Sequence, residues 1–138
     1  MNSVEVVAGI IFSKDRQSLL LGFRSASQHQ GNLWEFPGGK VESGEAQEAA
    51  LIRELQEEVG ILATDVRFWQ TISHDYGDKA VNLHFYGVYD FTGKPQSLES
   101  QSVTWVPVPE VGTLEFPAAN KPIVDALLAS GSEFKPPG

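Results

Sequence analysis

Runs of apolar, largely β-branched residues alternate with short polar segments along the chain, and these runs predict several β-strands. The first run, residues 4–12, is apolar at nearly every position, which is typical of a strand buried on both faces. Residues 66–74 and 80–91 flank a polar turn and are expected to form a β-hairpin. The predicted strands cover residues 4–12, 18–23, 66–74, 80–91 and 103–106.

A helical pattern occupies the middle of the chain. Residues 46–59 contain good helix formers without proline or glycine, and Gly60 follows as a typical helix stop. Leu51, Leu55 and Val59 recur at four-residue spacing. One face of this helix is therefore expected to pack against the core.

A second helix is predicted to open within residues 117–122, close to the end of the chain. Its apolar stripe consists of Ile123, Leu127 and Leu128. Strands on both sides of one long helix, with a second helix at the end, predict an α/β fold with a mixed sheet between helices. We expect one domain over residues 1–130 and a frayed C-terminal tail at residues 131–138.

The composition narrows the classes of function. The chain has 138 residues, of which 41% are hydrophobic, and no apolar run approaches the ~20 residues that cross a bilayer. Residues 1–12 lack the features of a signal peptide, so we expect a cytoplasmic protein without membrane contact. We also expect this protein to be a monomer. The absence of cysteine excludes disulfides and thiolate catalysis.

The formal net charge of −8 argues against broad contact with a nucleic-acid backbone, which depends on clustered Lys and Arg. It also bears on small phosphate ligands. An acidic protein that binds a polyanion needs a divalent cation to bridge carboxylate and phosphate.

Glu54, Glu57 and Glu58 supply carboxylates for such a cation. Their i, i+3, i+4 spacing places them in one sector of the predicted helix, where they repel one another. Three hard oxygen donors at the edge of a buried face suit Mg²⁺ or Mn²⁺. The alternative is a solvated acidic face, because each like-charge pair costs only ~0.2–0.5 kcal/mol.

The residues around these glutamates match, at every specified position, the pattern G-x5-E-x7-R-E-U-x-E-E-x-G-U, in which U is aliphatic. The matching residues are Gly39, Glu45, Arg53, Glu54, Leu55, Glu57, Glu58, Gly60 and Ile61. This pattern is the signature of the Nudix hydrolases, which the chain therefore resembles. The resemblance implies the Nudix fold, an α/β/α sandwich with a mixed central sheet.

The resemblance extends to the members of the family that hydrolyse 8-oxo-dGTP. It is carried by residues 7–11, 35–40, 53–61 and 116–122. It implies that the metal ligands are the Gly38 carbonyl oxygen, Glu54, Glu57, Glu58 and Glu99. It also implies that Glu45 holds Arg53, which in turn orients the catalytic glutamates.

The same resemblance implies a set of substrate-binding residues. Arg24, His29 and Lys40 fall where those members contact phosphates, and the Phe36 backbone and the Asn120 side chain fall where they read the purine. An arginine that helps to hold the base aligns with Lys79 here, which lacks the planar guanidinium fork.

Simpler roles remain open for several of these residues. Asn120 is also a suitable helix N-cap, because asparagine is favoured there and Pro122 follows. Arg53 can form a surface ion pair with Glu57 at i+4. Arg24 and His29 can be solvated loop residues.

The activity implied by the resemblance is hydrolysis of a nucleoside triphosphate, 8-oxo-dGTP first among them, to monophosphate and pyrophosphate by substitution at the β-phosphorus. Metal ions would neutralise the phosphates, and a carboxylate would take a proton from water. We expect Glu54 to be this base, with Glu99 as the alternative. A pyrophosphohydrolase for CTP or modified pyrimidine nucleotides and a non-catalytic nucleotide sensor are the competing functions.

Overall fold

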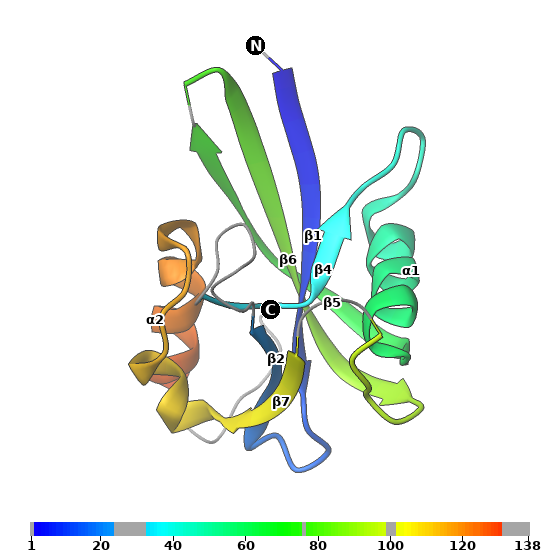
Figure 1. The fold of residues 1–138 in the computed structure, drawn as a ribbon, viewed down its shortest axis with the longest axis vertical. Helices are drawn as coiled ribbons and strands as arrows, with labels where there is room; N and C mark the ends of the chain where they lie inside the picture. The colour runs from blue at the N-terminus through cyan, green and yellow to red at the C-terminus, as the bar shows by residue number, and fades with distance from the viewer. Residues whose placement is uncertain (1, 24–32, 76, 99–101, 131–138) are drawn as a thin grey trace.

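The computed structural model describes residues 2–23, 33–75, 77–98 and 102–130, and in these residues one mixed sheet lies between two helices (Figure 1). The strands are β1 (Asn2–Phe12), β2 (Ser18–Phe23), β3 (Trp34–Glu35), β4 (Gly38–Lys40), β5 (Leu62–Asp75), β6 (Lys79–Thr92) and β7 (Ser102–Pro107). The helices are α1 (Gln47–Val59), α2 (Lys121–Ser130) and the 3₁₀ turns η1 (Val108–Thr113) and η2 (Ala118–Asn120). The predicted α/β/α arrangement is confirmed.

Strand β1 is the centre of the sheet. It runs parallel to β6 along one edge, from the pair Asn2 and Lys79 to the pair Ile11 and Val88. Its other edge is shared between two antiparallel partners, because β4 pairs with residues 6–8 and β2 with residues 11–12. This division brings the glycine pair of β4 against the middle of β1.

The two faces of the sheet carry separate cores. On one face, Leu51, Leu55 and Val59 of α1 are fully buried against β1 and β6, as their spacing predicts. On the other face, Ile123 and Leu127 of α2 are also fully buried. The predicted α2 stripe is wrong at Leu128, which is 39% exposed.

Most predicted elements are found close to their expected positions. Strand β2 has the predicted bounds, and β5 and β6 form the predicted antiparallel hairpin with longer arms. Strands β3 and β4 were not predicted, because strands of two and three residues show no hydrophobic period. Among the described residues, no helix is long and apolar enough to cross a bilayer.

Candidate active site

The candidate site is built on the last two turns of α1. The helix ends at Gly60, whose φ of 72° is left-handed and whose N–H donates to the Gln56 carbonyl at 3.2 Å. The three glutamates lie on the rim of the buried face. Glu58 is 4% exposed, the Glu54 side chain is 17% exposed and the Glu57 side chain is 54% exposed.

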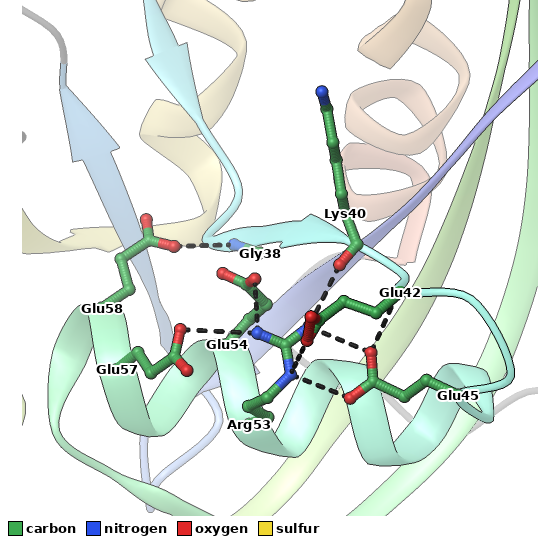
Figure 2. A network of polar contacts seen from close by, with 8 residues as sticks. All are labelled: Gly38, Lys40, Glu42, Glu45, Arg53, Glu54, Glu57 and Glu58. Atoms are coloured by element: carbon green, nitrogen blue, oxygen red, sulfur yellow. Dashed lines mark hydrogen bonds and ion pairs between the residues drawn. The ribbon is translucent and has the colours of Figure 1, made fainter.

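Arg53 connects these carboxylates to the loop that precedes the helix (Figure 2). Its Nε and Nη2 donate to the two oxygens of Glu45 at 2.8 and 3.0 Å, which is a bidentate pair. Its Nη1 donates to Glu54 at 2.9 Å and, more weakly, to Glu57 at 3.4 Å. Its Nη2 also reaches the Lys40 carbonyl oxygen at 3.2 Å. One guanidinium therefore fixes Glu54 relative to both β4 and the loop.

The Arg53–Glu45 pair is strongly ionised. Hydrogen bonds from Arg53, and then from the Glu42 backbone N–H, lower the pKa of Glu45 from 4.5 to about 2. The hydrogen bond to Glu45 is the main cause that raises the pKa of Arg53 above its usual value. The i+4 partner Glu57 is thus a secondary partner of Arg53, at a longer distance than Glu45 or Glu54.

The glycine pair of β4 lies directly against β1 and α1. A side chain at Gly38 would overlap the Val7 carbonyl oxygen, and a side chain at Gly39 would overlap the carboxylate of Glu54. Neither glycine has a positive φ, so both are needed for space. The Gly38 N–H donates to Glu58 Oε2 at 3.3 Å, which brings this predicted pair of ligands together (Figure 2).

The donors fit a hard divalent cation in their chemistry. Glu54, Glu57, Glu58 and the Gly38 backbone offer only oxygen ligands on this side of the molecule. No three acidic or histidine side chains within the described ranges form a ready-made metal group, since Glu54 and Glu57 turn toward Arg53. Mg²⁺ usually keeps several waters and uses one or two carboxylates with substrate phosphates, so a complete protein cage is not required.

A cavity of about 240 Å³ opens on the other side of the glycine pair, and its lining includes Gly38, Gly39, Phe36 and Asn120. Phe36 is buried and stacks on Phe116 at 5.2 Å between ring centroids. The fold therefore brings Phe36 and Asn120 together in a cavity that shares Gly39 with the surroundings of the Glu54 carboxylate. Asn120 is the last residue of η2 and directly precedes α2.

Other predicted residues lie elsewhere. Lys79 pairs with Asn2 at the start of β6, four residues before the cavity residue Leu83, which is ~13 Å along a strand. The Lys40 side chain points away from the Arg53 network (Figure 2). Arg24, His29 and Glu99 fall outside the described residues.

Glu35, which the sequence reasoning did not assign, also lines the cavity. The signal that could have found it is an acidic residue within the otherwise apolar segment Leu33-Trp34-Glu35-Phe36-Pro37. Its place at the cavity depends on the pairing of β3 with β2.

Comparison with known proteins agrees with this geometry. The family model described as NUDIX domain matches residues 7–126. The chain belongs to the Nudix family. The predicted family and the predicted class of enzyme, a Nudix hydrolase, are thereby confirmed. Nudix hydrolases generally use a divalent metal.

Similar Nudix proteins include two from Escherichia coli. The 8-oxo-dGTP diphosphatase is 34% identical, over 92% of this chain and 98% of that protein. The CTP pyrophosphohydrolase is 39% identical, over 94% of both chains. A structure from a study of MutT of Aliivibrio salmonicida and Vibrio cholerae matches with a TM-score of 0.84 and 37% identity, covering 94% of this chain and 99% of that one.

Proposed function

We propose that this Nudix hydrolase converts 8-oxo-dGTP to 8-oxo-dGMP and pyrophosphate, with Mg²⁺ as the working cation and Mn²⁺ as a substitute. One observation carries the proposal. The cavity lined by Phe36 and Asn120 is also lined by Gly38 and Gly39, and these two glycines lie next to Glu58 and Glu54 of α1. A nucleotide whose base enters the cavity would place its phosphates beside Glu54 and Glu58.

In the proposed reaction, a water oxygen attacks the β-phosphorus and the bond from that phosphorus to the α,β-bridging oxygen breaks. The monophosphate leaves, and pyrophosphate carries the water oxygen. The water's proton passes to a carboxylate. Glu54 is our proposed base, because it lies on α1 beside the proposed metal ligands and Arg53 orients its carboxylate. Glu99 is the alternative base.

The metal would be held by Glu54, Glu57, Glu58, Glu99 and the Gly38 carbonyl oxygen. When bound, it would neutralise phosphate charge and lower the pKa of the attacking water. Arg53 keeps Glu54 oriented during this step, and Glu45 keeps Arg53 in place. Arg24, His29 and Lys40 are the proposed phosphate contacts.

Base recognition is assigned to the Phe36 backbone and the Asn120 side chain. An asparagine amide has a donor and an acceptor, so it can pair with the altered edge of 8-oxoguanine, where N7 carries hydrogen and C8 carries oxygen. Lys79 was proposed for the base as well, but its place at the hairpin end argues for a weaker role.

The test is pyrophosphate release with Mg²⁺ across a nucleotide panel that includes 8-oxo-dGTP, dGTP and CTP, using the parent and Asn120→Ala. We expect the parent to prefer 8-oxo-dGTP over dGTP, and Asn120→Ala to lose roughly 10–100-fold of that preference. A cap role would instead cost ~1 kcal/mol of stability and affect all substrates alike. A parent without the preference would contradict the proposed substrate.

A second candidate substrate is CTP or a modified pyrimidine nucleotide. It is supported by the E. coli CTP pyrophosphohydrolase, which is 39% identical to this chain. Every signature residue would keep its role, and only the base contacts would differ. Preferred turnover of CTP in the panel would establish this alternative.

We also propose that residues 1–130 act as one domain, with residues 131–138 as a tail. The protein is expected to work as a cytoplasmic monomer on free nucleotides. Its net charge of −8 disfavours a nucleic-acid substrate. Sedimentation analysis and a nucleic-acid binding assay test these statements.

A further inference from the structure

Phe116 lies behind the wall of the cavity that is proposed to hold the base, called here the base cavity. Two of its wall residues come from distant parts of the chain, because Phe36 follows β3 and Asn120 ends η2. The described residues that line this cavity do not include Phe116. The Phe116 ring nevertheless stacks on the Phe36 ring at 5.2 Å between centroids, with 19° between the ring planes. Phe116 therefore supports the base cavity from outside.

The Phe36 ring helps to hold its own backbone in place. Strand pairing stops at Glu35, the end of β3, and resumes at Gly38, the start of β4. Between these points the buried Phe36 ring is held by two aromatic contacts, the stack on Phe116 and an edge-on contact with Phe85 at 5.8 Å. Because no strand pairing fixes this link, the place of the Phe36 backbone depends on where Phe116 lies.

Phe116 is also joined to Asn120 through a short segment with two backbone hydrogen bonds. The carbonyl oxygen of Pro117 accepts the Asn120 N–H at 2.9 Å. On the other side of Phe116, the carbonyl oxygen of Glu115 accepts the Trp34 N–H of β3 at 2.8 Å. The segment that carries Asn120 is thus tied to the segment that carries Phe36 by one hydrogen bond and one aromatic stack.

A second cavity, of about 380 Å³, borders the same segment. Its lining includes Leu114, Phe116 and Val124, and Pro117 lines both cavities. Protein interiors are close-packed, so a side chain beside open space has fewer neighbours to hold it. Loss of the stack on Phe36 would leave this segment room to shift, and the two walls of the base cavity would move relative to each other.

We propose that Phe116 is a positioning residue for base recognition, whose ring sets the separation between Phe36 and Asn120. This inference rests on the proposed function and deepens it. A hydrogen bond weakens steeply when its distance or angle departs from the optimum. A displaced Asn120 would therefore lose more with 8-oxo-dGTP, whose oxidised edge it reads, than with dGTP. The carboxylates of α1 would keep their place, because none of them contacts Phe116 in the described contacts.

The experiment is a double-variant cycle on the ratio of kcat/KM for 8-oxo-dGTP over dGTP with Mg²⁺. We expect Phe116→Leu to lower the parent ratio roughly 3–10-fold, through a higher KM for 8-oxo-dGTP, while kcat stays within about twofold of the parent. In the Asn120→Ala background, the same change should alter the ratio by less than about twofold, because the amide that Phe116 positions is gone.

Two further variants separate positioning from stability. Phe116→Tyr keeps the ring and should keep the ratio within about twofold of the parent. Leu114→Ala is the matched control, because Leu114 packs on the same core and lines the second cavity but not the base cavity. It should lower Tm and leave the ratio unchanged. If Phe116→Leu turns over too slowly to measure, calorimetric binding of 8-oxo-dGMP and dGMP gives the corresponding ratio.

The outcomes distinguish failure of this role from failure of the proposed function. A parent that prefers 8-oxo-dGTP, with a Phe116→Leu variant that keeps the full preference, would overturn the role of Phe116 alone. Equal losses from Phe116→Leu with and without Asn120 would overturn it as well, because a general loss of packing does not act through the amide. A parent with no preference for 8-oxo-dGTP would overturn the proposed substrate and this role together.

Discussion

At the scale of single residues, Arg53 is the contact on which the geometry of Glu54 depends. It donates hydrogen bonds to Glu45, Glu54 and the Lys40 carbonyl oxygen, so its loss would release the Glu54 carboxylate. Arg53 does not line the cavity, so the proposed base-binding residues would stay in place. We predict that Arg53→Ala lowers kcat by about 10²-fold, the effect expected of a misplaced catalytic group, while KM changes less than about threefold. Arg67→Ala is the control, because Arg67 forms an exposed pair with Asp65 at 3.1 Å. Normal turnover by Arg53→Ala would favour a surface ion pair instead.

The metal assignment gives a second prediction at this scale. Glu57→Gln and Glu58→Gln each replace an anionic oxygen by an amide of similar volume, and we expect each to lower kcat/KM with Mg²⁺ by at least ~10²-fold. Mn²⁺ affinity, measured by calorimetry, should fall in parallel. Glu48→Gln in the first turn of α1 is the control. Parent rates in both variants would show that these residues are not ligands.

The sequence predicts these helix residues but not all of the cavity. Glu54, Glu57 and Glu58 lie on one continuous helix, so their spacing fixes their mutual placement. The cavity is assembled from β1, β3, β4, β6 and η2, and its lining depends on how strands pair. That is why Glu35 was missed as a residue of the cavity lining.

At the scale of elements, the contact between β4 and α1 separates two functions of the glycine pair. An alanine side chain at residue 39 would meet the flexible end of Glu54, whereas one at residue 38 would meet the backbone of β1. We predict that Gly39→Ala lowers kcat by at least tenfold, an effect of misplacing Glu54, and barely changes Tm. Gly38→Ala should instead lower Tm by several degrees, because the β1 backbone must move.

Gly9→Ala provides the matched control for these two variants. A side chain there would contact Ile11, Leu51 and Leu55 at 3.5 Å, which is an ordinary packing distance. Its activity and Tm should stay close to those of the parent. If Gly39→Ala also kept full kcat, the Glu54 carboxylate would not need its place against β4.

Elements with a regular hydrophobic pattern or a run of helix formers were predictable from the sequence. Short strands that exist only through pairing with another strand were not. The alternation in β6 and the helix formers of α1 are properties of the local sequence. Strands β3 and β4 exist because β2 and β1 supply their partners. Helix α2 begins at Lys121, within the predicted opening at residues 117–122, and the unpredicted η2 turn lies directly before it.

At the scale of the whole molecule, several carboxylates make the folded state sensitive to acid. Glu5, Asp15, Glu45 and Asp90 each have a pKa below the ordinary value, and in each case a side-chain hydrogen bond is the main cause. A group with a lowered folded pKa stabilises the protein above its unfolded pKa. That stabilisation is lost as the pH falls through the folded value.

Glu45 provides the sharpest test of this acid sensitivity, because its pKa falls from 4.5 to about 2. The stabilisation from its pair with Arg53 should be complete above about pH 5 and should shrink as the pH falls from 4.5 toward 2. We therefore predict that the Tm difference between the parent and Glu45→Gln is largest at pH 6–7 and decreases steadily below pH 5. Glu110→Gln, at an exposed position of η1, corrects for the change in net charge. A Tm difference that stays constant from pH 7 to pH 3 would mean that the Glu45 carboxylate gains nothing from Arg53 in the folded protein.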